Sequence, residues 1–236
     1  MSKINSLSSE TSDQFRRDFL RGVTVAAGAA VTAAVVRGQT PTTPPAPSPA
    51  NDITILNYAL TLELLEATFY TQGLTRFSSA DFASSTAFAN LRTASGVSSG
   101  APLSGASDTG LVQDIYAYLT LIRNHEQQHV RTLTNTIRSL GGTPVATPNF
   151  RLNFTTADAF LSLAATLENT GVAAYNGAIA QIFNPALVTA SATIATVEAR
   201  HAAYLNRING TNPFPDAFDA GKTVAEILAI AAPFLG

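Results

Sequence analysis

Two short motifs in this chain place an imidazole three residues after a carboxylate. Glu126 precedes His129 in HEQQHVRTL, and Glu198 precedes His201 in VEARHAAYL. Seven glutamates among 236 residues give a histidine this neighbour by chance about 3% of the time, yet two of the three histidines have it. Residues three apart share one face of a helix, so each motif can direct a carboxylate oxygen and an imidazole nitrogen at one metal ion.

Glutamates in apolar surroundings supply further acidic groups. Glu63 lies in LTLELLEATFY, and Glu168 lies in LAATLENTGVAAY. An ionised carboxylate is costly to bury without a partner, so a positive charge must neutralise such groups. Two helices that each supply a glutamate, together with two that each supply Glu-x-x-His, form the ligand set of di-iron and di-manganese carboxylate bundles. A polar network that binds no metal is the alternative.

A tyrosine follows the acidic residue by seven positions in two segments. Tyr70 follows Glu63 and Tyr175 follows Glu168, and one Glu-x-x-His motif comes after each pair along the chain. Seven residues are about two helical turns, so each tyrosine shares a face with its glutamate. This order indicates a two-fold repeat of a helical hairpin. The tyrosines are either packing aromatics whose hydroxyls bond a buried carboxylate or redox partners of a metal centre.

Two more ionisable residues lie beside the motifs. Glu66 is one turn from Glu63 on a neighbouring face, which favours a solvated carboxylate or an outer neighbour of the ligands over a seventh ligand. His125 directly precedes Glu126. Because Glu126 takes the inward direction, we expect His125 to be a surface or capping histidine.

Helical periodicity surrounds all of these residues. Apolar residues recur at intervals of three and four in four segments, which predicts the long helices of an all-α four-helix bundle. The segments are residues 53–74, 110–140, 156–183 and 186–208.

Helix-ending residues separate the segments. Gly141 and Gly142 end the second, Thr155 or Thr156 can cap the third, and Asn184 with Pro185 separates the third from the fourth. Residues 78–110 are rich in Ser, Gly and Ala, so we expect a long crossing connection with one short helical turn. We expect residues 222–235 to form a short C-terminal helix that packs on the outside of the bundle.

The N-terminal segment differs in composition from the predicted bundle. Arg16 and Arg17 precede an apolar stretch of about 14 residues, short for a bilayer span, so residues 1–38 resemble a twin-arginine export signal. An uncleaved membrane anchor or a buried helix is the alternative. Residues 39–51 repeat proline and predict an extended linker, which leaves residues 52–236 as the domain. We therefore expect a bacterial periplasmic or envelope protein without a stable membrane span after signal removal.

Charge and cysteine content exclude several kinds of function. The 12 arginines and 2 lysines are scattered in a chain of net charge −2, so no nucleic-acid binding is expected. The absence of cysteine removes disulfides, thiolate catalysis and cysteine-ligated metal sites. Histidine and carboxylate remain as metal ligands.

Residues 53–210 resemble the ferritin-like superfamily, and with the leader the chain is similar to exported ferritin-like domain proteins related to the desiccation-related group. The first two motif segments, LTLELLEATFY and HEQQHVRTLTNTIRSLGGTP, resemble the first two ligand helices of bacterioferritins. The third and fourth, SLAATLENTGVAAYNGAI and VEARHAAYLNRI, look like the other two. The resemblance implies a ferritin-like bundle with two Fe or Mn ions per protomer. The implied ligands are Glu63, Glu126, His129, Glu168, Glu198 and His201, with Glu126 and Glu198 as the bridging pair.

The chain departs from bacterioferritins in its leader, in the long connection and in its methionine content. Met1 is the only methionine, which argues against a bacterioferritin-like haem site. The resemblance leaves open whether the chain forms a cage or another homo-oligomer.

Three functions are compatible with this sequence. A di-metal oxidoreductase would act on oxygen, peroxide or Fe(II) as a ferroxidase, peroxidase or catalase-like enzyme in oxidative or desiccation stress. A non-enzymatic stress protein of the envelope would bind metal for sequestration or stability. A structural module without metal is the third. The residues themselves do not decide between turnover and storage, or between iron and manganese.

Overall fold

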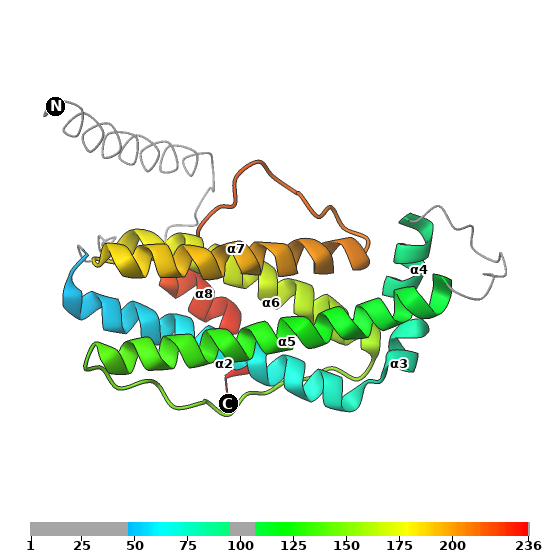
Figure 1. The fold of residues 1–236 in the computed structure, drawn as a ribbon, viewed down its shortest axis with the longest axis horizontal. Helices are drawn as coiled ribbons and strands as arrows, with labels where there is room; N and C mark the ends of the chain where they lie inside the picture. The colour runs from blue at the N-terminus through cyan, green and yellow to red at the C-terminus, as the bar shows by residue number, and fades with distance from the viewer. Residues whose placement is uncertain (1–46, 95–106, 236) are drawn as a thin grey trace, which may run out of the picture. The chain divides into compact units, whose positions relative to one another are not determined.

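Four long helices form an antiparallel bundle in the computed structural model, which describes residues 47–94 and 107–235 (Figure 1). They are α2 (Pro49–Arg76), α5 (Ser107–Ser139), α6 (Ala157–Ala178) and α7 (Pro185–Ile208). The predicted all-α four-helix bundle is confirmed. The predicted export signal and the first part of the linker lie outside the described residues.

Local chemistry sets the ends of these helices. The Ser48 side chain caps α2, and Pro49 occupies its first turn, so α2 begins three residues before the predicted domain start at residue 52. Thr156 caps α6, one of the two predicted alternatives, and Asn184 caps α7. After α5, Gly141 adopts a φ of 78°, a conformation that glycine reaches without steric cost.

The predicted crossing connection is wrong for the described residues of segment 78–110, namely 78–94 and 107–110. The described part of that segment forms α3 (Ser79–Ala83) and α4 (Thr86–Ala94) at one end of the α2–α5 hairpin. Phe82 is fully buried there, and Ser78 with Asp81 makes a capping box at the start of α3. The Ser/Gly/Ala composition did not predict these helices. Helix α3 is stabilised by one buried aromatic side chain and a local cap, and neither produces a long apolar repeat in the sequence.

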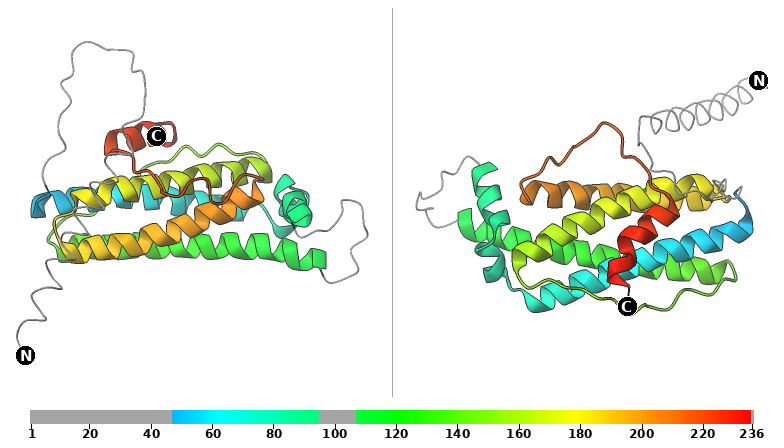
Figure 2. Two further views of the ribbon diagram at one scale, coloured as in Figure 1. Left: turned by 90° about the horizontal axis from the view of Figure 1, so that it is seen from above. Right: turned by 180° about the vertical axis from the view of Figure 1, so that it is seen from behind.

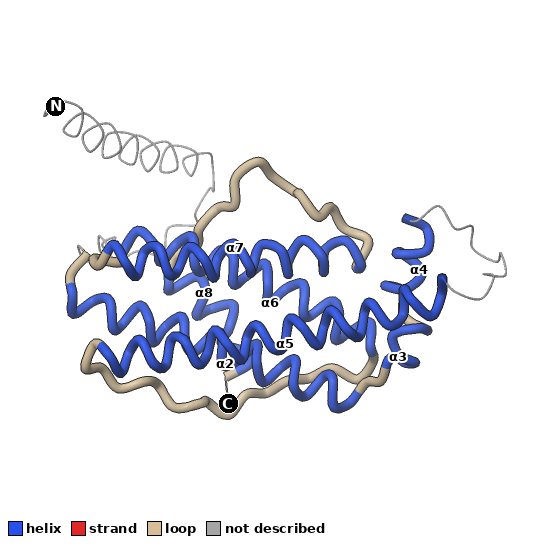
Figure 3. Tube along the Cα trace, in the orientation of Figure 1, coloured by secondary structure: helices blue, strands red, loops and turns tan. Residues whose placement is uncertain are grey.

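The connection that crosses the bundle runs between α5 and α6. These two helices point the same way, so residues 140–156 must return along the bundle (Figures 1 and 3). Asn57 of α2 holds this return segment: its side chain accepts from the Val145 backbone NH at 2.7 Å and donates to the Thr143 carbonyl at 3.1 Å. The fold is thus two hairpins, α2–α5 and α6–α7, joined by one crossover.

Two apolar clusters fill the ends of the bundle and leave its middle to polar residues. One end is aromatic, and Phe69 stacks on Phe160 with ring centroids 4.6 Å apart and 17° between the planes. The other end is mainly aliphatic and includes Leu60 and Ile137. This packing stabilises the four helices on both sides of the central polar layer.

The C-terminal helix covers the outside of the bundle, as predicted. Helix α8 (Val224–Ala231) lies against the outside of the bundle (Figure 2), and its buried Ile227 packs with Leu62 of α2 and Ala174 of α6. A 3-10 turn, η2 (Ala232–Phe234), follows. The backbone carbonyl of Phe234 accepts a hydrogen bond from the backbone NH of Arg151, on the crossover, at 2.8 Å. Among the described residues, no helix combines the length and apolar character that crossing a membrane requires.

Candidate metal centre

The structure brings the six predicted ligand residues together in the polar middle layer. Each of the four long helices contributes, because the Glu-x-x-His spacing turns both side chains of a motif to one face. All six side chains belong to buried residues: Glu63, Glu126, His129, Glu168, Glu198 and His201. Their role as metal ligands stays a prediction.

The six residues form two overlapping clusters. In each cluster, one nitrogen or oxygen atom per residue lies within 4.8 Å of those of the other members. One cluster contains Glu63 and His129, the other contains Glu168 and His201, and both contain Glu126 and Glu198. We call them the Glu63–His129 half-site and the Glu168–His201 half-site. Glu126 and Glu198 are the shared pair, the positions that the bacterioferritin resemblance assigns to bridging ligands.

Glu126 faces both half-sites with different oxygens. Its Oε2 lies 3.0 Å from His129 Nδ1, and its Oε1 lies 3.1 Å from His201 Nδ1. Each histidine also faces the glutamate of its own half-site: His129 Nδ1 is 3.1 Å from Glu63 and His201 Nδ1 is 3.2 Å from Glu168. Both Nδ1 atoms therefore point into the carboxylate layer.

The shared pair fits a cation on structural grounds. Glu126 Oε1 and both carboxylate oxygens of Glu198 are buried without a hydrogen bond. Histidine nitrogens approach two of these oxygens to 3.1 and 3.2 Å, but not in a direction suited to hydrogen bonding. Buried carboxylate oxygens that lack a hydrogen bond need another positive partner. Oxygen and imidazole donors of this kind suit iron or manganese.

The two repeat tyrosines bond the glutamate of the opposite hairpin. Tyr70 on α2 donates its hydroxyl to Glu168 on α6 at 2.6 Å, and Tyr175 on α6 donates to Glu63 on α2. The first of the two interpretations, in which the tyrosine hydroxyls hydrogen-bond buried carboxylates, is therefore observed. These exchanged hydrogen bonds hold the outer glutamates in place and link the two hairpins.

Carboxylate contacts favour the protonated form of both histidines. Burial disfavours charge on His129, but its contacts with the carboxylates of Glu126, Glu198 and Glu63 outweigh burial and raise its pKa to about 12. For His201, burial also opposes charge, and contacts with Glu126 and Glu168 raise the pKa to about 9. Without a metal ion, protons on these rings neutralise part of the acidic layer.

Burial favours the neutral form of several carboxyl groups. It raises the pKa of Glu126 to about 7, with the negative charge of Glu168 adding to the effect. Burial and then the charge of Glu126 raise the pKa of Glu198 well above its usual range. Metal binding at this layer must therefore displace protons.

Glu66 is buried beside the shared pair. Its residue is only 4% exposed, so the solvated alternative is wrong, and it stands outside both four-residue clusters. Burial, followed by the charge of Glu198, raises the pKa of Glu66 well above its usual range. Glu66 is thus a buried neighbour of the shared pair that favours its neutral, proton-bearing form.

Gly171 provides the space for these side chains. A Cβ at position 171 would lie 2.9 Å from Glu198 Oε2 and 3.4 Å from Glu66 Oε1. By the two-fold repeat, Gly171 of α6 stands three residues after Glu168, as Glu66 stands three after Glu63. The repeat therefore places one carboxyl group where its other half has no side chain. Our sequence reasoning did not single out Gly171, although its place in the repeat was a signal.

The replacement Gly171→Ala is expected to weaken metal binding about 10-fold or more, the effect of disturbing groups that orient ligands. The added methyl group forces Glu198 Oε2 to move. The same contact exists in the metal-free fold, where the higher helix propensity of alanine, about 1 kcal/mol over glycine, offsets part of its cost. Competition with a chelator measures the affinity, and Thr170→Ala on the same helix is the control. Unchanged affinity in Gly171→Ala would contradict the tight fit.

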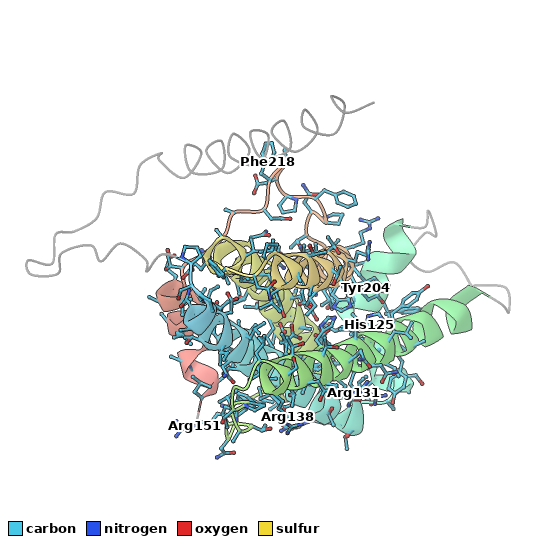
Figure 4. The ribbon with its side chains drawn as sticks, turned by 60° about the vertical axis from the view of Figure 1, so that its left-hand side comes forward. His125, Arg131, Arg138, Arg151, Tyr204 and Phe218 are labelled. Atoms are coloured by element: carbon cyan, nitrogen blue, oxygen red, sulfur yellow. The ribbon has the colours of Figure 1, made fainter. Side chains whose placement is uncertain are left out.

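His125 has a contact that the sequence did not reveal. Its side chain is exposed, as predicted, but its ring lies nearly parallel to that of His201, with centroids 5.2 Å apart and 13° between the planes. His125 Nδ1 lies 2.9 Å from His201 Nε2. In Figure 4, His125 lies between α5 and α7, whereas Arg131 and Arg138 project from the other side of α5.

Comparisons with known proteins follow the same part of the chain. Residues 51–211 match the family described as "Ferritin-like domain", a range that includes every side chain of both half-sites. Protein rds1 of Schizosaccharomyces pombe is 23% identical over 184 residues. That alignment covers 78% of this chain and 39% of rds1, so the chain spans well under half the length of this curated relative.

Proposed function

The chain belongs to the ferritin-like domain family, and from that premise we propose that its bundle binds two iron or manganese ions and acts on oxygen, peroxide or Fe(II). Membership agrees with the predicted resemblance to the ferritin-like superfamily. The match to Protein rds1 supports the predicted relation to the desiccation-related group. The buried carboxylate and histidine groups are compatible with metal binding in general.

One observation carries the proposal: Glu126 and Glu198 belong to both half-sites, and three of their four carboxylate oxygens are buried without a hydrogen bond. A pair of acidic residues shared in this way suits two neighbouring cations. Two redox-active ions, when bound there, can together exchange two electrons with oxygen or peroxide.

The protein's own groups prepare the site in three ways. The Nδ1 atoms of His129 and His201 face the carboxylates, so each ring can give a lone pair to a cation once its proton has left. The hydroxyls of Tyr70 and Tyr175 orient the outer glutamates. Burial and the charge of Glu198 raise the pKa of Glu66, which favours a protonated carboxyl that can serve as a general acid beside the shared pair.

Anaerobic loading with Fe(II), followed by oxygen, tests this function. We expect about two Fe(II) per chain to bind and oxygen consumption to continue as further Fe(II) is added, because an enzyme returns to its starting state. Oxygen uptake that stops after the bound iron has reacted would instead support the non-enzymatic function, sequestration or stabilisation. Hydrogen peroxide with Mn(II)-loaded protein provides the parallel assay. No metal binding at all would overturn both.

We further propose that residues 1–38 direct export through the twin-arginine route and that the domain takes up its ions before export. The adjacent Arg16 and Arg17 and the short apolar stretch support this, and they lie outside the described residues. Nitrogen and oxygen ligands follow the Irving–Williams order, so zinc or copper would outcompete iron or manganese at an empty site outside the cytoplasm. Folding and loading inside avoids that competition.

Exchange of residues 1–38 for a general secretory signal tests the export proposal. We expect the natural leader to yield periplasmic protein with iron or manganese, and the exchanged leader to yield protein with zinc, copper or no metal. Elemental analysis of both exported products measures the difference. Equal iron or manganese contents would show that the route plays no part in metal selection.

A further inference from the structure

His125 is the one histidine that the proposed ligand set does not use. It lies on α5 directly before Glu126, with its side chain exposed at the surface between α5 and α7. Its ring is nearly parallel to that of His201, and its Nδ1 is at hydrogen-bonding distance, 2.9 Å, from His201 Nε2.

The contact with His125 concerns which ring nitrogen of His201, Nδ1 or Nε2, carries the proton of the neutral ring. The Nδ1 atom of His201 is turned toward Glu126 and Glu168, at 3.1 and 3.2 Å. A ring nitrogen that holds a cation carries no proton, so the neutral ring then carries its proton on Nε2. His201 Nε2 therefore donates, and His125 Nδ1 accepts. His125 must in turn carry its own proton on Nε2.

The other half-site lacks such a partner. Among the residues whose side chains the structure describes, no hydrogen bond is made by Nε2 of His129. The two-fold repeat gives the reason. His125 stands one residue before Glu126, and the equivalent position before Glu198 is Val197, whose side chain has no hydrogen-bonding group. The two halves of the repeat therefore differ at this position, in addition to the difference between Glu66 and Gly171.

We propose that His125 is a positioning residue that makes the Glu168–His201 half-site bind its cation more tightly than the Glu63–His129 half-site. Hydrogen bonds from a ligand histidine to an outer partner orient the ring and raise its basicity, and losing one typically costs 10–100-fold in metal affinity. The inference rests on the proposed function, because it requires a cation at each half-site. It adds that the two ions are unequal, with the ion near the exposed His125 the tighter one.

Anaerobic titration of the metal-free full chain with Co(II), followed by its visible absorption, tests the proposal. Wild type is expected to bind two ions in two resolved steps. His125→Phe keeps an aromatic ring but removes the acceptor, so the tighter step should weaken about 10–100-fold while the weaker step stays unchanged. His125→Asn places an amide oxygen near the lost nitrogen and should restore most of the difference. Gln128→Ala, an exposed change on the same helix, should leave both steps unchanged.

A reciprocal variant strengthens the test. Val197→His supplies the missing histidine in the second half of the repeat, and it is expected to tighten the weaker step. Two Co(II) ions bound with a single affinity in wild type, or identical titrations of wild type and His125→Phe, would overturn the inference and leave the proposed function intact. Equal weakening of both steps in His125→Phe would indicate a merely structural role and would also overturn it. Absence of Co(II) binding by wild type would overturn the proposed function and the inference together.

Discussion

Replacement of both Glu126 and Glu198 by alanine is expected to reduce bound metal from about two ions per chain to none. The two glutamates are the members common to both half-sites. Without them each half-site keeps one glutamate and one histidine, two protein ligands in place of four. Elemental analysis after anaerobic loading with Fe(II) or Mn(II) measures the loss.

A matched control separates this effect from a general loss of acidic charge. Asp216→Ala with Asp219→Ala also removes two carboxylates, but both residues are exposed on the segment between α7 and α8. This control should keep its full metal content. Circular dichroism should show that the Glu126→Ala, Glu198→Ala variant still folds, since it removes buried charge rather than apolar packing. Equal metal contents in the double variant and wild type would refute the assignment of the site.

Removal of metal by chelation is expected to lower the melting temperature by about 8–16 °C. Free metal at about 1,000 times Kd stabilises the folded state by about 4 kcal/mol per site, and a domain of this size shifts by about 2–4 °C per kcal/mol, so one site accounts for this range and a second ion bound as tightly adds as much again. The physical cause is the layer of buried carboxyl groups, which loses its cations on chelation. An unchanged melting temperature would mean that the acidic layer does not bind metal in the folded protein.

The effect of metal on stability should grow with pH. In the metal-free fold, the pKa of Glu126 is raised from 4.5 to about 7, and those of His129 and His201 from 6.5 to about 12 and 9. Each group therefore holds its proton more tightly in the folded state than in the unfolded state. Its contribution to the free energy of unfolding is complete below the unfolded pKa and is lost as pH rises through the folded pKa. Metal binding needs deprotonated ligands and strengthens over the same range.

Thermal melts at about pH 5.5, 7 and 8.5, with and without metal, measure this dependence. The metal-free protein should melt at progressively lower temperature as pH rises through these values. The difference between loaded and metal-free protein should widen. A metal-free protein that becomes more stable toward pH 8.5 would show that carboxyl and histidine protons do not replace the cations in the way the contacts suggest.

The sequence by itself determined the bundle helices and the six clustered residues. A period of 3.6 residues places positions three and four apart on one side of a helix, so the apolar pattern and the Glu-x-x-His spacing reveal which side of each helix faces inward. The Glu–Tyr spacing exposed the two-fold repeat for the same reason. These are relations within one helix, which the order of residues contains directly.

Contacts between helices were decided by the tertiary structure. Three contacts depend on how two helices are rotated and offset against each other. They are the tyrosine hydrogen bonds between α2 and α6, the space that Gly171 leaves for Glu66, and the contact of His125 with His201. The place of the crossover depends on the direction in which α5 and α6 pack. A periodic pattern gives the inward face of a helix, but not which residue of a neighbouring helix meets it, because that depends on side-chain packing across the whole interface.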